Sequence, residues 1–108
     1  MGNATSNFSK FYLYYLREHS QTVTRSLHYI GTTLLWGLIC FAVTTGAWFY
    51  LWLAPAVGYG FAWFGHFGVE KNKPSTFTHP FLSLASDHVM LFHFLTRRLS
   101  KKLKEAGV

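Results

Sequence analysis

Three histidines and one glutamate carry the chemistry that this sequence could perform. They are His19, His28, His66 and Glu70. His66 and Glu70 lie four residues apart, so on a helix both side chains can point at one object. Two imidazoles and a carboxylate with open coordination positions suit non-haem iron(II) and oxygen chemistry. Adding His19 would give a three-histidine or a four-ligand site.

Other histidines and motifs limit this interpretation. His79, His88 and His93 follow in the C-terminal part of the chain and are weaker candidates. No HExxH, Walker or GxSxG motif occurs, and neither do the HxxxH and HxxHH boxes of membrane di-iron hydroxylases. A haem held between His28 and His66 is a second interpretation. A histidine near a membrane interface is most often a hydrogen-bonding residue, so a hairpin that scaffolds partners is a third.

A long uncharged block must position these residues. No Asp, Glu, Lys or Arg occurs over residues 26–69. One transmembrane helix needs about 20 apolar residues, so the block predicts two spans, over residues 25–45 and 48–69, joined by a tight turn. Such a hairpin brings His28 and His66 to the same depth and the same side of the membrane. Imidazoles there are costly unless they pair, line water or bind a ligand.

The distribution of charge separates a membrane protein from a nucleic-acid-binding one. The chain has ten Lys and Arg against four Asp and Glu, a net charge of +6, and 19% aromatic residues. A basic, aromatic chain could bind nucleic acid, but here every basic residue lies outside the uncharged block. We therefore expect membrane lipids and no nucleic acid as partners. The positive-inside rule puts both termini in the cytoplasm, at a bacterial inner membrane or the endoplasmic reticulum.

Amphipathic segments flank the predicted hairpin. Apolar side chains recur at helical spacing over residues 8–19, which predicts an interfacial helix. A loop is expected over residues 71–80, followed by a basic amphipathic helix over residues 83–105 that lies along anionic lipid. The expected fold is all-α: a single membrane domain over residues 1–108, with two transmembrane helices between N- and C-terminal interfacial helices.

Two stretches resemble a known family. They are FYLYYLREHSQTVTRSLHYIGTTL and VGYGFAWFGHFGVEKNKPSTF. The family is that of the 2-hydroxy fatty acid dioxygenases of fatty-acid α-oxidation, formerly a domain of unknown function, with a yeast member in the endoplasmic reticulum. Its pattern is a Tyr-rich helix with a histidine, a second histidine nine residues on, and a later GHxxxEKxxP. These elements match here as His19, His28 and Gly65-His66 through Glu70-Lys71 to Pro74.

The resemblance implies an iron(II)-dependent enzyme that uses O2 to shorten a 2-hydroxy long-chain fatty acid by one carbon. It implies metal binding by His19, His28, His66 and Glu70, with His66 and Glu70 catalytic. The chain is most similar to short bacterial members. It departs from the family pattern at Thr22 and Thr24, where Pro and Asn are usual. We also expect that two copies could pair as a homodimer, since two spans and two interfacial helices enclose little volume.

Overall fold

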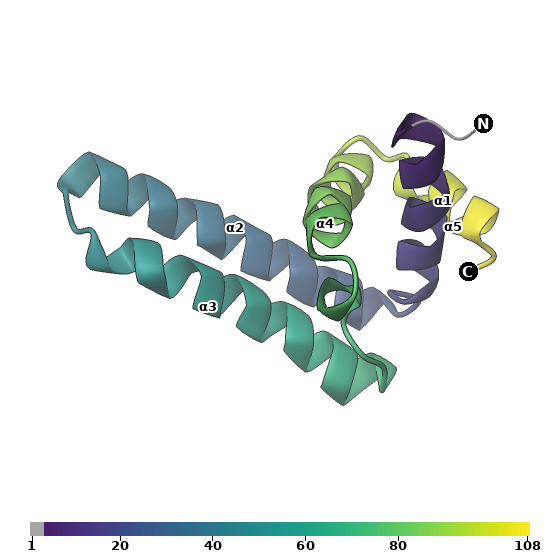
Figure 1. Cartoon of the computed structure of the whole chain (residues 1–108), viewed down its shortest axis with the longest axis horizontal. Helices are drawn as coiled ribbons and strands as arrows, with labels where there is room; N and C mark the ends of the chain where they lie inside the picture. The colour runs from purple at the N-terminus through teal and green to yellow at the C-terminus, as the bar shows by residue number, and fades with distance from the viewer. Residues whose placement is uncertain (1–3) are drawn as a thin grey trace. The chain divides into compact units, whose positions relative to one another are not determined.

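The computed structural model describes residues 4–108, with side chains from Asn7 onward, and these residues form helices and no strand (Figure 1). The all-α prediction is therefore confirmed for the part of the chain that the structure describes. The elements in chain order are α1 (Ala4–Arg17), α2 (Thr22–Thr45), α3 (Phe49–Phe64), the π-helix η1 (Gly65–Glu70), the 3₁₀ turn η2 (Ser75–Phe77), α4 (Pro80–Leu95) and α5 (Leu99–Ala106).

The described part of the chain forms two compact units. The single membrane domain over residues 1–108 stays a prediction. The hairpin unit is the continuous segment Gln21–Lys71, which contains α2, α3 and η1. The terminal unit combines the chain up to Ser20 with Asn72–Val108, and it contains α1, η2, α4 and α5. Each unit is described by itself below.

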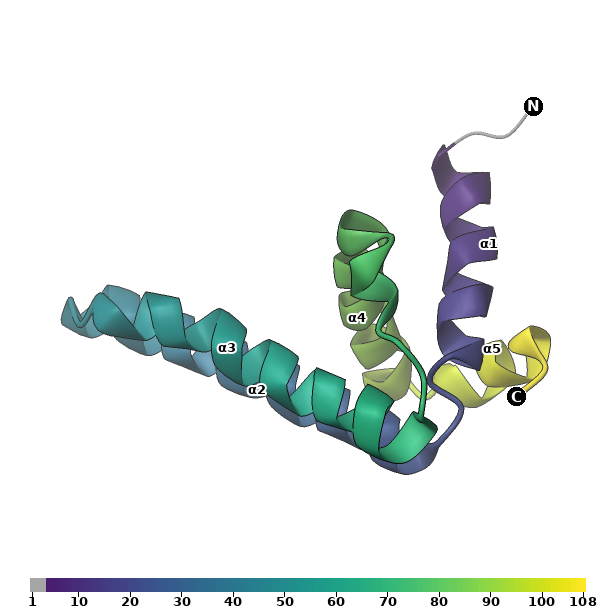
Figure 2. The same cartoon turned by 60° about the horizontal axis from the view of Figure 1, so that its bottom comes forward.

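In the hairpin unit, α2 and α3 run side by side in opposite directions (Figures 1 and 2). Gly46 ends α2 in the left-handed conformation, with φ of 75°, and its N–H donates to the Ala42 carbonyl at 2.9 Å. Glycine adopts this conformation without the steric cost that a Cβ would add. The chain therefore reverses at the turn predicted between residues 45 and 48.

Small residues let the two helices of the hairpin approach closely. A Cβ built on Gly31 would lie 2.8 Å from the Gly58 carbonyl oxygen and 3.1 Å from Phe61 Cβ. Nearer the open end, a Cβ on Gly65 would lie 3.0 Å from Thr24 Cγ2. Close backbone approach at small residues is typical of helix pairs in membranes. The glycines of the second predicted span thus bring α3 and η1 against α2.

Among the described helices, α2 is long and apolar enough to cross a membrane. The second span, predicted over residues 48–69, is divided into α3, which has 16 residues, and the π-helix η1. The regular part is shorter than the roughly 20 residues that a span needs, so the two-span hairpin is not confirmed. Both helices nevertheless expose large apolar side chains: Phe41 is 48% exposed and Trp52 82%.

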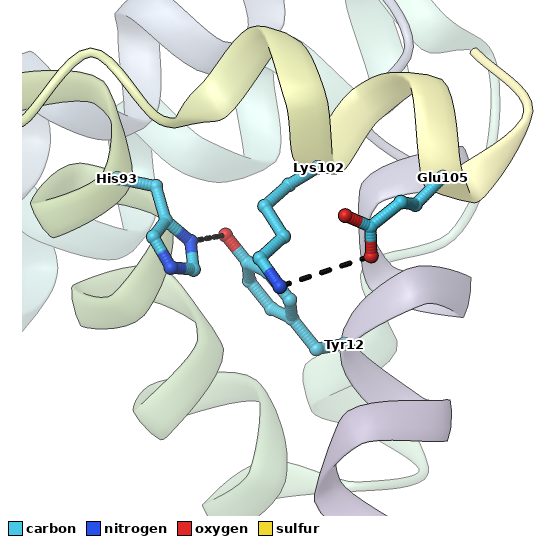
Figure 3. A network of polar contacts seen from close by, with 4 residues as sticks. All are labelled: Tyr12, His93, Lys102 and Glu105. Atoms are coloured by element: carbon cyan, nitrogen blue, oxygen red, sulfur yellow. Dashed lines mark hydrogen bonds and ion pairs between the residues drawn. The ribbon is translucent and has the colours of Figure 1, made fainter.

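In the terminal unit, α1 packs against α4 and α5. The apolar face predicted to lie in the membrane interface is buried in the protein itself, and its most buried members are Tyr15 and Leu16. The Tyr12 hydroxyl on the same face is hydrogen-bonded to His93 Nδ1 in α4 at 2.8 Å, and Lys102 and Glu105 of α5 form an ion pair nearby at 3.8 Å (Figure 3). Burial, together with the nearby cations Lys102 and Arg98, holds the pKa of His93 below its ordinary value.

One helix is predicted over residues 83–105, but the structure has α4 and α5 there, with a break between them. Arg97 has a positive φ of 62°, and the Arg98 N–H donates to the His93 carbonyl at 2.8 Å. This is the hydrogen-bond pattern of a Schellman motif, which ends a helix. In addition, Thr96 Oγ1 donates to the Phe92 carbonyl at 2.8 Å. The predicted loop over residues 71–80 contains the turn η2, and α4 begins at its last residue.

Candidate metal centre

The hairpin unit brings two buried histidines into direct contact. His28 lies in the second turn of α2, and His66 is the second residue of η1. Their rings meet edge to face, with centroids 5.1 Å apart and planes at 85°. Both side chains are buried, and their ligand nitrogens lie within 4.8 Å of each other. The proximity that a hairpin predicts for residues 28 and 66 is therefore confirmed.

This histidine pair, His28 and His66, fits a shared metal ion. Two imidazoles bound at about 2.1 Å to one ion, with an angle of about 100° between them, place their ring centroids about 5 Å apart. The observed separation of 5.1 Å matches that spacing. The same contact leaves no room for a porphyrin between the rings, so the geometry does not favour the haem interpretation.

A backbone contact fixes which nitrogen of His28 faces a ligand. Its Nδ1–H donates to the Thr24 carbonyl one turn earlier, at 2.9 Å. The proton is therefore on Nδ1, and Nε2 keeps the lone pair that a metal needs. His88 makes the same kind of bond to the Leu84 carbonyl at a more accessible position. This hydrogen bond alone therefore does not identify a metal ligand. His28 differs from His88 in that its side chain is buried.

His19 has the same arrangement in the terminal unit. Its Nδ1–H donates to the Tyr15 carbonyl at 2.7 Å, and its ring stacks on that of Tyr15 with centroids 3.9 Å apart. Tyr15 in turn donates its hydroxyl proton to the Asp87 carboxylate in α4. His19 is fully buried. Its orientation is therefore set by a carbonyl and an aromatic ring that are themselves held in place.

Three buried histidines could hold a metal ion, and they are His19, His28 and His66. We call them the histidine triad. Three imidazoles that leave open positions form a donor set suited to a catalytic divalent metal. His79, His88 and His93 are not members of this group.

Glu70 has a structural partner in the hairpin unit. Its Oε2 accepts the backbone N–H of Gln21 at 2.7 Å, and Gln21 Nε2 donates to the Val69 carbonyl at 3.3 Å. Gln21 directly precedes α2, where an unpaired N–H and the helix dipole both favour a carboxylate. Glu70 thus joins the end of η1 to the start of α2. The prediction that Glu70 binds metal stays a prediction.

Two buried polar residues, Thr24 and Arg25, lie in the turn of α2 that precedes His28. Thr24 is fully buried, and its Oγ1 has no hydrogen-bond partner among the residues that the structure describes. A buried hydroxyl without a partner is costly, and here it lies one turn before His28. Arg25 is also buried, and its guanidinium donates to Thr22 Oγ1 at 3.1 Å. A buried hydroxyl and a buried cation therefore lie close in the chain to His28, one member of the pair.

The sequence does not predict that Asp87 holds Tyr15 and, through it, supports His19. Tyr15 lies on the apolar face that helical spacing predicts over residues 8–19, and its hydroxyl also donates to Asp87. Asp87 is the single acidic residue over residues 71–104, and an acidic residue inside an otherwise apolar helix was the available signal.

The pH dependence of stability tests the burial of Asp87. Burial raises its pKa from 3.8 to about 6, although the Tyr15 hydrogen bond and nearby His88 both act to lower it. Between these pH values the folded state keeps a proton that the unfolded state loses, so stability falls as pH rises through this window. Asp87→Asn should flatten the fall, as measured by melting temperature in detergent from about pH 4 to about pH 7. Equal slopes for both proteins would contradict the assignment.

Neither a search of curated proteins nor a search of solved structures found a match. A family model described as 2-hydroxy-palmitic acid dioxygenase Mpo1-like matches residues 5–99, which include the whole histidine triad. This match confirms the resemblance found in the sequence. The chain belongs to the Mpo1-like family.

Proposed function

We propose that this protein is an iron(II)-dependent membrane dioxygenase that converts 2-hydroxy fatty acids to fatty acids one carbon shorter. The observation that carries the proposal is the buried, edge-to-face contact of His28 and His66. The family description names a 2-hydroxy-palmitic acid dioxygenase, and the reaction class comes from that name.

The histidine triad would hold the iron. Iron(II) would supply the redox chemistry that lets O2 react with an organic substrate. His19 and His28 each have Nδ1–H bound to a carbonyl, which leaves Nε2 as the ligand atom. Glu70 remains a predicted fourth ligand and catalytic residue. Its hydrogen bond from the Gln21 N–H supports a role in positioning η1, and therefore His66.

The residues beside the pair suit the polar end of the substrate. Arg25 offers a guanidinium to the carboxylate, and the Thr24 hydroxyl can donate to a carboxylate or hydroxyl oxygen. Lys71 and Lys73, the first lysines after the uncharged block, are exposed. Burial strengthens a charge-assisted hydrogen bond, so we assign carboxylate recognition to Arg25 and Thr24.

The overall reaction balances without a further reductant. A 2-hydroxy acid and O2 give the shortened acid, CO2 and water: the C1–C2 bond breaks, C2 becomes the new carboxyl carbon, and O2 takes up the electrons. This chain's residues would bind and orient the substrate. Enclosure by buried side chains would exclude bulk water from the reacting carbon.

We also propose the membrane arrangement that the sequence predicts. α2 is one candidate span, and α3 together with η1 forms a continuous helical segment, Phe49–Glu70, of sufficient length for the second. Exposed apolar side chains such as Trp52 and Phe49 would then face lipid. Both termini would be cytoplasmic. The homodimer also stays a prediction.

Turnover by the purified protein tests this function. The protein is loaded with iron(II) under anaerobic conditions, mixed with 2-hydroxypalmitate carrying a labelled carboxyl carbon, and exposed to O2. We expect the shortened fatty acid and labelled CO2 in equal amounts, with matching O2 uptake. Iron-loaded protein that consumes no O2 and forms no shortened acid would refute the proposal. A Soret band in the purified protein would instead support the haem interpretation.

A further inference from the structure

The hairpin unit carries an apolar groove beside the histidine pair. The groove has a volume of about 440 Å³, within the range of small-molecule sites. We call it the hairpin groove, and its lining residues are Leu27, Ala56, Val57, Gly60, Phe61 and Phe64. All of them are apolar or glycine, so the groove offers no side-chain donor or acceptor to a polar ligand.

One end of the hairpin groove lies next to the candidate metal centre. A Cβ built on Gly65, the residue before His66, would lie 3.0 Å from Thr24 Cγ2 and 3.5 Å from Cδ1 of Leu27, which lines the groove. From Phe64 the lining residues continue back along α3 to Ala56, a distance of about 12 Å at 1.5 Å per residue. One end of the groove is therefore close to buried polar groups, and the rest is apolar.

We propose that the hairpin groove holds the acyl chain of the substrate, with the carboxylate at the histidine end. This inference rests on the proposed function. The arrangement matches an amphiphile: Thr24 and Arg25 lie in the turn of α2 that precedes Leu27, and only apolar surface lies beyond. A polar ligand would lose its hydrogen bonds to water in the apolar part without replacement. A long-chain 2-hydroxy acid is the occupant that satisfies both ends.

Gly60 determines how much of the groove is open. A Cβ built on Gly60 meets no atom within 4 Å, so a larger side chain can enter the groove without a clash. Gly37 on α2 has the same property but does not line the groove. Both glycines are exposed and lie within helices, so leucine raises helix propensity equally at either position. Gly37→Leu is therefore a matched control for Gly60→Leu.

The chain-length preference of the two variants tests the inference. The measured quantity is the ratio of kcat/KM for 2-hydroxypalmitate to that for 2-hydroxyhexanoate. Each methylene that loses its burial costs about fourfold, so Gly60→Leu should lower the ratio by about tenfold or more. Gly37→Leu should keep the wild-type ratio. Bound iron should be equal in all three proteins.

The outcomes separate this inference from the proposed function. If wild type turns over 2-hydroxypalmitate and Gly60→Leu keeps its ratio, the acyl groove is wrong and the function stands. If no 2-hydroxy acid is turned over, the function fails, and photo-crosslinking with a diazirine-bearing 2-hydroxy fatty acid still tests the groove. Labelling of Val57 and Phe61 that is lost in Gly60→Leu supports the groove. Equal labelling around Gly37 and Gly60 overturns it.

Discussion

Replacing His66 with alanine should remove bound iron and turnover together. His66 is buried and contacts His28 edge to face, so the substitution removes one proposed ligand nitrogen from the buried site. Loss of a residue that merely orients a ligand lowers metal affinity about 10–100-fold, and loss of the ligand itself should cost at least the upper end of that range. The measurement is iron per protein after dialysis against a chelator.

His88→Ala is the matched control for this experiment. His88 makes the same Nδ1–H bond to a carbonyl four residues earlier as His28 does, at the same distance of 2.9 Å. It lies in α4 and is not part of the triad. We expect wild-type iron content in His88→Ala. Circular dichroism establishes that both variants are folded, and equal iron in folded His66→Ala and wild type would overturn the metal centre.

Gly31→Ala should weaken the hairpin although alanine favours helices. The added Cβ would lie 2.8 Å from the Gly58 carbonyl oxygen, and a backbone atom cannot rotate away as a side chain can. The helices must separate, and overpacking of this kind typically costs about 1–3 kcal/mol. Because Gly→Ala in an open helical position is favourable by about 1 kcal/mol, the comparison must be made against Gly37→Ala, where the Cβ meets nothing within 4 Å.

The expected result is a lower melting temperature for Gly31→Ala than for Gly37→Ala in the same detergent. Separation of α2 and α3 should also disturb the histidine pair, so iron affinity should fall in Gly31→Ala and stay unchanged in Gly37→Ala. If Gly31→Ala and Gly37→Ala have the same melting temperature, the helices do not approach closely at Gly31.

The sequence predicted the pairing of His28 and His66 because a hairpin has simple geometry. An uncharged block with a central turn makes its two ends neighbours, whatever the details of packing. The sequence predicted less of the terminal unit. The apolar face of α1 has the same periodicity whether it covers lipid or protein, so its burial against α4 and α5 could not be distinguished from an interfacial location.

Other differences between the sequence prediction and the structure come from local backbone geometry, which residue types do not specify. Arg97 is not a residue type that favours positive φ, so the break between α4 and α5 has no strong signal in the sequence. The spacing of His66 and Glu70 is compatible with a shared metal ion and equally with separate partners. The Gln21 N–H that binds Glu70 lies 49 residues earlier in the chain, and only tertiary structure could reveal it.

The link between Glu70 and Gln21 also bears on the order of events during synthesis. It joins the two ends of the hairpin unit, which is one continuous segment, whereas the terminal unit needs both the beginning and the end of the chain. A ribosome makes residues 21–71 before residues 72–108, so the hairpin can close, and His28 can meet His66, while the terminal unit is still incomplete. Tyr15, which supports His19, must wait for Asp87. The third histidine of the proposed site is therefore the last to gain its support, and the nascent hairpin would emerge with two ligands in place before the third is secured.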